Sequence, residues 1–229
     1  MSTAKNRICS VCELPMEGSY CSKCGQRYTG KRVSQSTVLQ DMLDNLYGLD
    51  KSLLGNLKLA VQNPQFLVQN FWSGFRNHYM GPGRVLVITA LALVLNFIVT
   101  KESFLLITIG TEQVGQQFVF LFVFLFLFCL SSYVAYFWPW KKNFAEHVVL
   151  NIYTVGLWTI LFTPLSILGG LLEDPAAEYF NTTSFILYAA LILIWNARVF
   201  PNQSRIKQFG RIVLQAALIA MLFWGLTFL

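Results

Sequence analysis

The amino-acid sequence predicts an all-α integral membrane bundle of about five transmembrane helices, preceded by a small cysteine-rich module. Two observations carry this prediction. Apolar residues make up 55% of the 229-residue chain and charged residues only 12%, against about 25% charged residues in an average soluble domain. Apolar runs long enough to cross a bilayer begin only near residue 84, whereas four of the five cysteines lie within the first 30 residues.

These patterns divide the chain into three parts. Residues 1–30 are the cysteine-rich module, residues 31–83 are predicted to form amphipathic or interfacial helices, and residues 84–229 are the transmembrane domain. Because the first apolar run starts near residue 84, we expect no cleavable signal peptide, and we expect the first transmembrane helix to direct insertion.

The middle part, residues 31–83, is predicted to be helical because its apolar side chains recur at helical spacing. Polar residues separate two such series, which are Val38, Met42, Leu43 and Leu46, then Leu53, Leu54, Leu57, Leu59 and Val61. The second series ends near Asn63-Pro64. Helices of this kind either pack on each other or lie on the membrane surface.

The apolar stretches after residue 83 are the candidate transmembrane helices, since a spanning helix needs about 20 residues. The predicted spans are residues 84–100, 118–138, 147–172, 184–200 and 212–229. The first span is short, and residues 104–110 are a candidate extension of it beyond a break at Lys101-Glu102.

The charges of the loops predict the orientation. The bases gather in the second and fourth loops, at Lys141, Lys142, Arg205, Lys207 and Arg211, whereas the third loop carries only acids, at Glu173, Asp174 and Glu178. Because basic loops remain in the cytoplasm, the N-terminus is predicted to be cytoplasmic and the C-terminus to lie outside.

The first 30 residues hold two Cys-x2-Cys pairs separated by eight residues, Cys9, Cys12, Cys21 and Cys24. Four thiolates at this spacing are typical of a tetrahedral Zn²⁺ site, and Gly18 and Gly25 permit the tight turns that it requires. We predict a zinc ribbon with a structural Zn²⁺, because four cysteines leave no open position for a substrate. Disulfides are the alternative, and a reducing cytoplasm disfavours them. The fifth cysteine, Cys129, is predicted to be a small apolar core residue.

Residues of this N-terminal part also match a known family. They are Cys9 and Cys12, Tyr20-Cys21-Ser22-Lys23-Cys24-Gly25-Gln26, Leu54-Gly55-Asn56-Leu57, Asn63-Pro64, and Trp72-Ser73-Gly74-Phe75-Arg76-Asn77-His78-Tyr79-Met80-Gly81-Pro82. In these residues the chain resembles a family of bacterial polytopic membrane proteins that carry an N-terminal zinc ribbon and have no established activity. The likeness covers about residues 9–100. It implies an architecture, that of a multi-pass protein of the bacterial inner membrane, and no particular reaction.

A polar cluster at the entrance to the first span is a candidate contact site, formed by Arg76, His78, Tyr79 and Arg84. One interpretation is a clamp for a lipid headgroup or a phosphate. The other is a basic anchor on the cytoplasmic side of the membrane.

Within the spans, polar residues are few. The candidates for an intramembrane polar seam are Asn96, His147, Asn151 and Asn196. Such residues either line a seam or simply form hydrogen bonds from helix to helix. No Asp or Glu stands near the middle of a predicted span, which argues against a proton-coupled transporter.

These features favour a binding protein over an enzyme. We expect the protein to dock or assemble a cytoplasmic protein partner at the inner membrane. The alternative is an oligomeric channel or membrane-perturbing accessory protein of a bacterial defence system, since small polytopic proteins of similar layout accompany antiphage systems. A lipid-modifying enzyme is not expected, because no nucleophile–base pair, paired carboxylates or phosphate-binding loop is present. The basic residues suit the lipid bilayer better than nucleic acid, because no base-reading motif accompanies them.

Overall fold

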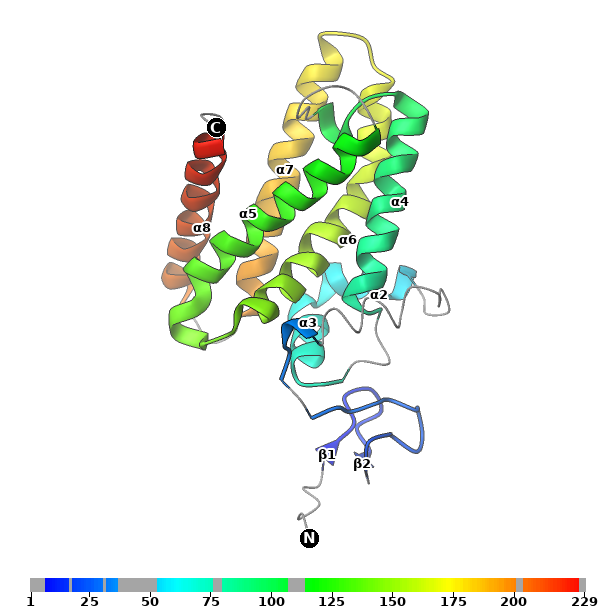
Figure 1. The fold of residues 1–229 in the computed structure, drawn as a ribbon, viewed down its shortest axis with the longest axis vertical. Coiled ribbons are helices and arrows are strands. Elements are labelled where there is room, and N and C mark those ends of the chain that lie inside the picture. Colours follow the sequence, from blue (N-terminus) through cyan, green and yellow to red (C-terminus); the bar gives the residue numbers. More distant parts are fainter. Residues whose placement is uncertain are drawn as a thin grey trace.

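The computed structural model describes residues 7–16, 18–30, 32–36, 53–75, 80–106, 114–200 and 204–226. Its elements are β1 (Arg7–Ile8), β2 (Pro15–Met16), α2 (Leu53–Gln62), α3 (Pro64–Trp72), α4 (Pro82–Thr100), the 3-10 helix η1 (Phe104–Leu106), α5 (Val114–Trp140), α6 (Phe144–Gly170), α7 (Ala176–Val199) and α8 (Arg205–Leu226). The chain is mostly helical with little sheet, which confirms the predicted all-α bundle with a small cysteine-rich module. Figure 1 shows the long helices side by side and the strands projecting from one end.

Four of the described helices, α4, α6, α7 and α8, are long and apolar enough to cross a membrane, and a further apolar stretch, Leu121–Phe137, lies within α5. Each predicted span overlaps one of these five helices. Some helices begin before the membrane spans predicted within them. Helix α7 begins at Ala176, ahead of the span predicted from residue 184, because polar residues such as Asn181 continue the helix although they lower its hydropathy. Helix α8 begins at Arg205, ahead of the span predicted from residue 212, for the same reason.

Helix α6 is the central helix of the bundle. In the most apolar stretch of α6, 67% of the residues are buried, compared with 6% in that of α8. Helix α8 lies at the edge of the bundle in Figure 1. Helices α4, α5 and α7 all pack against α6. We call the end of the bundle that carries the strands the module end, and the other end the far end. Helix α6 begins at the module end, where the Asn143 side chain accepts a hydrogen bond from Glu146 N and the Glu146 side chain accepts one from Asn143 N.

The chain turns back into the bundle after α4. Lys101 ends the helix in the left-handed conformation, with φ of 61°. The following η1 helix is buried, since Leu105 N donates to Ser166 Oγ at 2.8 Å and the Phe104 ring packs against the Tyr188 ring. Residues 104–106 therefore do not extend the first span as a continuous helix, and residues 107–110 lie outside the described residues.

Helices α2 and α3 cap the module end. Asn63 separates them, and its side chain accepts a hydrogen bond from Phe66 N at the start of α3. Four of the buried side chains of α3, those of Leu67, Val68, Phe71 and Trp72, join the same core as α6. Helix α3 thus packs on the bundle itself. The first predicted amphipathic series, Val38 to Leu46, lies outside the described residues.

Candidate metal centre and its junction with the bundle

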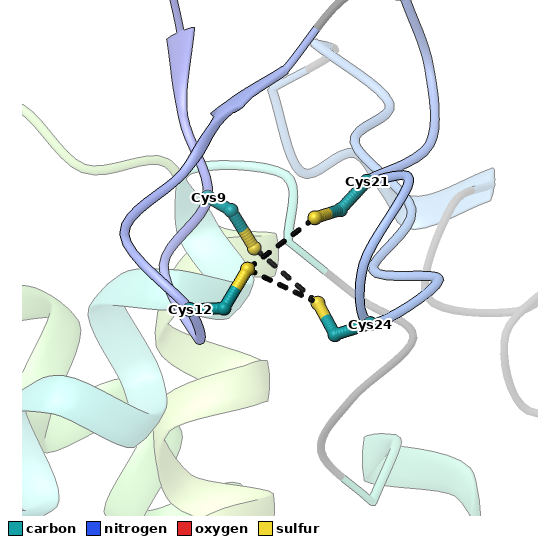
Figure 2. Close-up of side chains that lie close together, drawn as sticks. All are labelled: Cys9, Cys12, Cys21 and Cys24. Carbon is teal, nitrogen blue, oxygen red and sulfur yellow. Dashed lines mark hydrogen bonds between the residues drawn. The ribbon is translucent and has the colours of Figure 1, made fainter.

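The four cysteines of the module converge on one point. Figure 2 shows their side chains pointing toward one another from two loops. The Sγ atoms of Cys9 and Cys24 are 3.5 Å apart, those of Cys12 and Cys21 are 3.4 Å apart, and those of Cys12 and Cys24 are 3.8 Å apart. All four sulfurs lie within 4.8 Å of one another.

These distances fit a tetrahedral metal site. Metal–sulfur bonds of about 2.3 Å in a tetrahedron place the sulfurs about 3.8 Å apart. A disulfide would require about 2.05 Å, and all five cysteines are free thiols. The four residues can therefore hold one metal ion between them.

The backbone of the two loops repeats the same turn. In the first loop Cys9 N donates to Leu14 O at 2.8 Å and Glu13 N donates to Cys9 O at 3.0 Å. In the second, Cys21 and Gly25 occupy the equivalent positions, because Cys21 N donates to Gln26 O at 2.9 Å and Gly25 N to Cys21 O at 2.9 Å. The fourth residue after each first cysteine has a positive φ, 57° at Glu13 and 68° at Gly25. The repeated turn presents both sulfurs of each pair to the same point.

The second loop also stabilises a thiolate. Backbone N–H groups of Cys24 and Lys23 donate to the Cys21 sulfur and lower the pKa of that thiol to about 6. Thiolates are the form that binds a metal, so the backbone prepares Cys21 as a ligand. Burial raises the pKa of the Cys24 thiol to about 12, so a metal ion would have to displace the proton of that thiol.

The cysteine module (the described residues from 7 to 30) is tied to the end of α3. Tyr28 forms a bridge with Phe75, and Thr29 N donates to Gly74 O at 3.1 Å. Gly74 has φ of 96°, and a Cβ there would stand 3.2 Å from Gly30 N, so only glycine allows this close approach. The Phe75 ring packs against the cluster that contains Cys9 and Cys21.

A second contact lies where the chain leaves the module. Arg32 donates to Glu146 Oε2 from Nη2 at 2.7 Å and from Nε at 3.2 Å, and its Nη2 also donates to Lys141 O at 2.7 Å. Glu146 is almost fully buried, at 1% exposure, and accepts further hydrogen bonds from Lys142 Nζ and Asn143 N. A buried carboxylate requires this degree of compensation.

Helix α3 joins the same contact. Trp72 Nε1 donates to Glu146 O at 3.0 Å, and Lys142 Nζ lies 4.4 Å from the centre of the Trp72 ring. Asn143 Nδ2 donates to Val33 O at 2.8 Å. We call this set the Glu146 junction, and its members are Arg32, Val33, Trp72, Lys141, Lys142, Asn143 and Glu146. It connects the segment after the cysteines, α3 and the first turn of α6.

The four residues of the predicted polar seam, Asn96, His147, Asn151 and Asn196, fall into two places. Asn151 Nδ2 donates to Ser132 Oγ at 2.7 Å, and Asn196 Nδ2 donates to Asn151 Oδ1 at 3.1 Å. His147 Nδ1 lies 3.2 Å from the same Ser132 Oγ, so α5, α6 and α7 meet in one buried cluster near the module end. Asn96 is not part of it. Its Nδ2 donates to Glu102 O at the far end of α4.

The other predicted contact cluster is described in part. Arg84 lies in the first turn of α4 and is half-buried, whereas Arg76, His78 and Tyr79 lie outside the described residues. Four further residues of these contacts were not predicted as site residues from the sequence, namely Arg32, Trp72, Ser132 and Glu146. One signal was available for Glu146, since Asn143 followed three residues later by an acid, just before an apolar run, is typical of a helix start.

The fold and the site together define a multi-pass helical membrane protein with a four-cysteine module at one end. No protein-family model, curated protein or solved structure matches the chain. Inference about its function therefore rests on the geometry of its own residues.

Proposed function

We propose that the protein is a zinc-ribbon membrane protein that docks a cytoplasmic protein partner at the bacterial inner membrane. The observation that carries this proposal is the surface of the cysteine module, where three large apolar side chains are exposed to solvent. Ile8 is 65% exposed, Tyr20 56% and Leu14 39%. Three such side chains on a module of about 24 residues are a candidate interaction surface.

Zn²⁺ is the metal that best suits the module. A tetrahedral set of four thiolates selects zinc or iron among the common metals, and a single four-cysteine zinc site is structural because its coordination shell is closed. The module has few buried apolar residues of its own, with Cys9, Met16 and Cys21 as its buried core. Metal binding thus supplies much of the folding free energy of the docking surface.

Charge supports a cytoplasmic location for the module. The bases Arg84, Lys142, Arg198, Arg205 and Lys207 stand at helix ends and loops of the module end, whereas the α6–α7 loop at the far end contains Glu173 and Asp174. Basic loops remain in the cytoplasm, where the reducing environment also keeps cysteines available for metal.

The exposed charges of the module indicate the chemistry of the partner. Arg7, Lys23 and Arg27 are exposed beside the apolar side chains, and Glu13 is the one exposed acid among the described residues of the module. We therefore expect a partner surface with an apolar centre and an acidic rim.

Co-purification of the partner tests the proposal. An Ile8→Asp/Tyr20→Asp variant of the full chain is expected to insert into membranes and bind zinc, but to lose the partner that the wild-type chain recovers. Val61→Asp is the matched control, because Val61 is 46% exposed on α2, outside the module. Recovery of the same partner by a chain lacking residues 1–30 would refute docking through the module.

The channel alternative receives less support from the geometry. The polar side chains along α6 bond within the bundle, as Thr159 does with Tyr188 at 2.8 Å and Asn151 does with Ser132. Such pairs stabilise helix packing.

A further inference from the structure

We propose that the metal site and the module end of the bundle are energetically coupled through the Glu146 junction. Metal binding by the cysteines would stabilise the contacts of the Glu146 junction at the module end. In turn, Glu146, in the first turn of α6, would act as a positioning residue for the metal site. This inference rests on the proposed metal, and it adds a form of regulation, because metal loading would then alter the transmembrane bundle itself.

The first step of the coupling runs from the metal ligands to α3. The chain that leaves Cys24 pairs at Arg27 with Tyr20, then at Tyr28 with Phe75. The Tyr28 and Phe75 rings lie 5.0 Å apart, and Phe75 also packs on the cluster of Cys9 and Cys21. Loss of the metal removes the constraint that holds the two cysteine loops together, and therefore weakens the surface on which Phe75 rests.

The second step runs from the same segment to α6. Arg32 lies four residues after Tyr28 in the sequence, and its guanidinium contacts both Glu146 and the carbonyl of Lys141. The Arg32 side chain is 59% exposed while that of Glu146 is 2% exposed, so the contact joins an exposed side chain after the module to a buried carboxylate of the bundle.

The third step enters the bundle. Trp72 of α3 and Glu146 of α6 share a hydrogen bond, so a displaced α3 disturbs the first turn of α6. The next residue, His147, belongs to the buried polar cluster, and its carbonyl oxygen lies 4.0 Å from the Cys129 sulfur of α5. Cys129 is 3% exposed, so a thiol reagent can reach it only when the packing of α5 against α6 loosens. The reactivity of this thiol therefore reports on the packing at this end of the bundle.

Zinc affinity of the intact protein in detergent or nanodiscs is the decisive measurement. Coupling between two sites is reciprocal, so a change at Glu146 must alter metal binding at the cysteines. Glu146→Gln keeps the size of the side chain and removes its charge. We expect it to weaken zinc binding by about 5-fold to 150-fold in competition with a chromophoric chelator. Glu173→Gln, at the far end, is the matched control and is expected to bind zinc as the wild type does.

Arg32→Ala tests the same contact from the side of the cysteine module. Its exposed side chain leaves no cavity in the bundle, and Lys58→Ala, which removes an exposed base from α2, is its control. Arg32→Ala is expected to weaken zinc binding in the same direction, and Lys58→Ala to leave it unchanged. Wild-type affinity in both Glu146→Gln and Arg32→Ala would overturn the coupling while leaving the metal assignment intact.

Alkylation of Cys129 by N-ethylmaleimide gives the reverse measurement. The reagent reaches a buried thiol only in locally opened molecules, so the rate follows the opened population. The thiol should be protected in the zinc-loaded protein and react about 5-fold faster or more after zinc is removed by a chelator, as followed by mass spectrometry of its peptide. Equal rates with and without zinc would overturn the proposal that metal loading reaches the bundle. Absence of zinc from the wild-type protein would overturn the metal assignment and the coupling together, whereas bound zinc without a recoverable partner would overturn docking alone.

Discussion

A methyl group added at Gly156 tests how closely α4 and α6 must pack. A Cβ at this position would stand 2.6 Å from Val85 Cγ1 and 2.9 Å from Thr89 Oγ1. Carbon atoms in contact prefer about 3.5–4.0 Å, so α4 must move away by about 1 Å. A gap of that size forfeits roughly a quarter to a half of the dispersion energy of the contacts it opens.

The expected magnitude combines two opposing effects. Overpacking of a close contact costs about 1–3 kcal/mol, while replacing a helical glycine by alanine stabilises by about 0.5–1 kcal/mol. Gly156→Ala should therefore lower the free energy of unfolding by up to about 2.5 kcal/mol. Gly210→Ala isolates the second effect, because a Cβ at Gly210 of α8 meets nothing within 4 Å. That control should be stabilised by about 0.5–1 kcal/mol.

Reversible unfolding in mixed micelles, followed by far-ultraviolet circular dichroism, measures both variants. The two substitutions are expected to shift the unfolding midpoint in opposite directions. If Gly156→Ala proves as stable as Gly210→Ala, the close approach of α4 to α6 is not a determinant of the packing, and the reasoning is refuted.

Three other variants probe the metal site, the membrane interior and the junction, and a dye-entry assay of the intact chain tests the channel alternative. Cys9→Ser/Cys12→Ser should reduce bound zinc from about one ion per chain to none by elemental analysis, with the transmembrane helices retained. Asn151→Leu should destabilise the bundle by about 0.6–1.7 kcal/mol in the same micelle assay, and no change would contradict the role of its hydrogen bonds. Trp72→Phe removes the donor to the Glu146 carbonyl and should cost about 0.5–1.5 kcal/mol. Cells that express the intact chain should exclude a small dye, whereas dye entry that the cysteine variant lacks would favour a zinc-dependent channel.

Local patterns predicted most of the architecture. The apolar runs located five helices, because a spanning helix must be apolar over about 20 residues whatever its neighbours are. Hydropathy does not locate the helix ends. Polar residues at the start of α7, such as Asn181, form hydrogen bonds within the helix, and Asn181 Nδ2 bonds to Ala177 O. The same limit applies to η1, whose burial depends on partners in α6 and α7.

The candidate polar seam shows what sequence order could and could not predict. Successive spans run in opposite directions, so Asn96, near the end of the first span, belongs at the opposite end from His147, near the start of the third. The topology predicted from charge already separates the two. The partner of His147, however, is Ser132 of α5, and only the rotation of α5 about its axis determines which of its side chains faces α6.

The sequence by itself determined the features that depend on neighbours along the chain. These are the spacing of Cys9, Cys12, Cys21 and Cys24, the apolar spans and the uneven distribution of charge. The tertiary structure alone decided which of these parts contact each other. Arg32 and Glu146 stand 114 positions apart, and nothing in the local sequence of either residue selects the other. Their pairing follows from the packing of α3 on α6 and from the Tyr28–Phe75 bridge, because together these bring the segment after the cysteines to the first turn of α6.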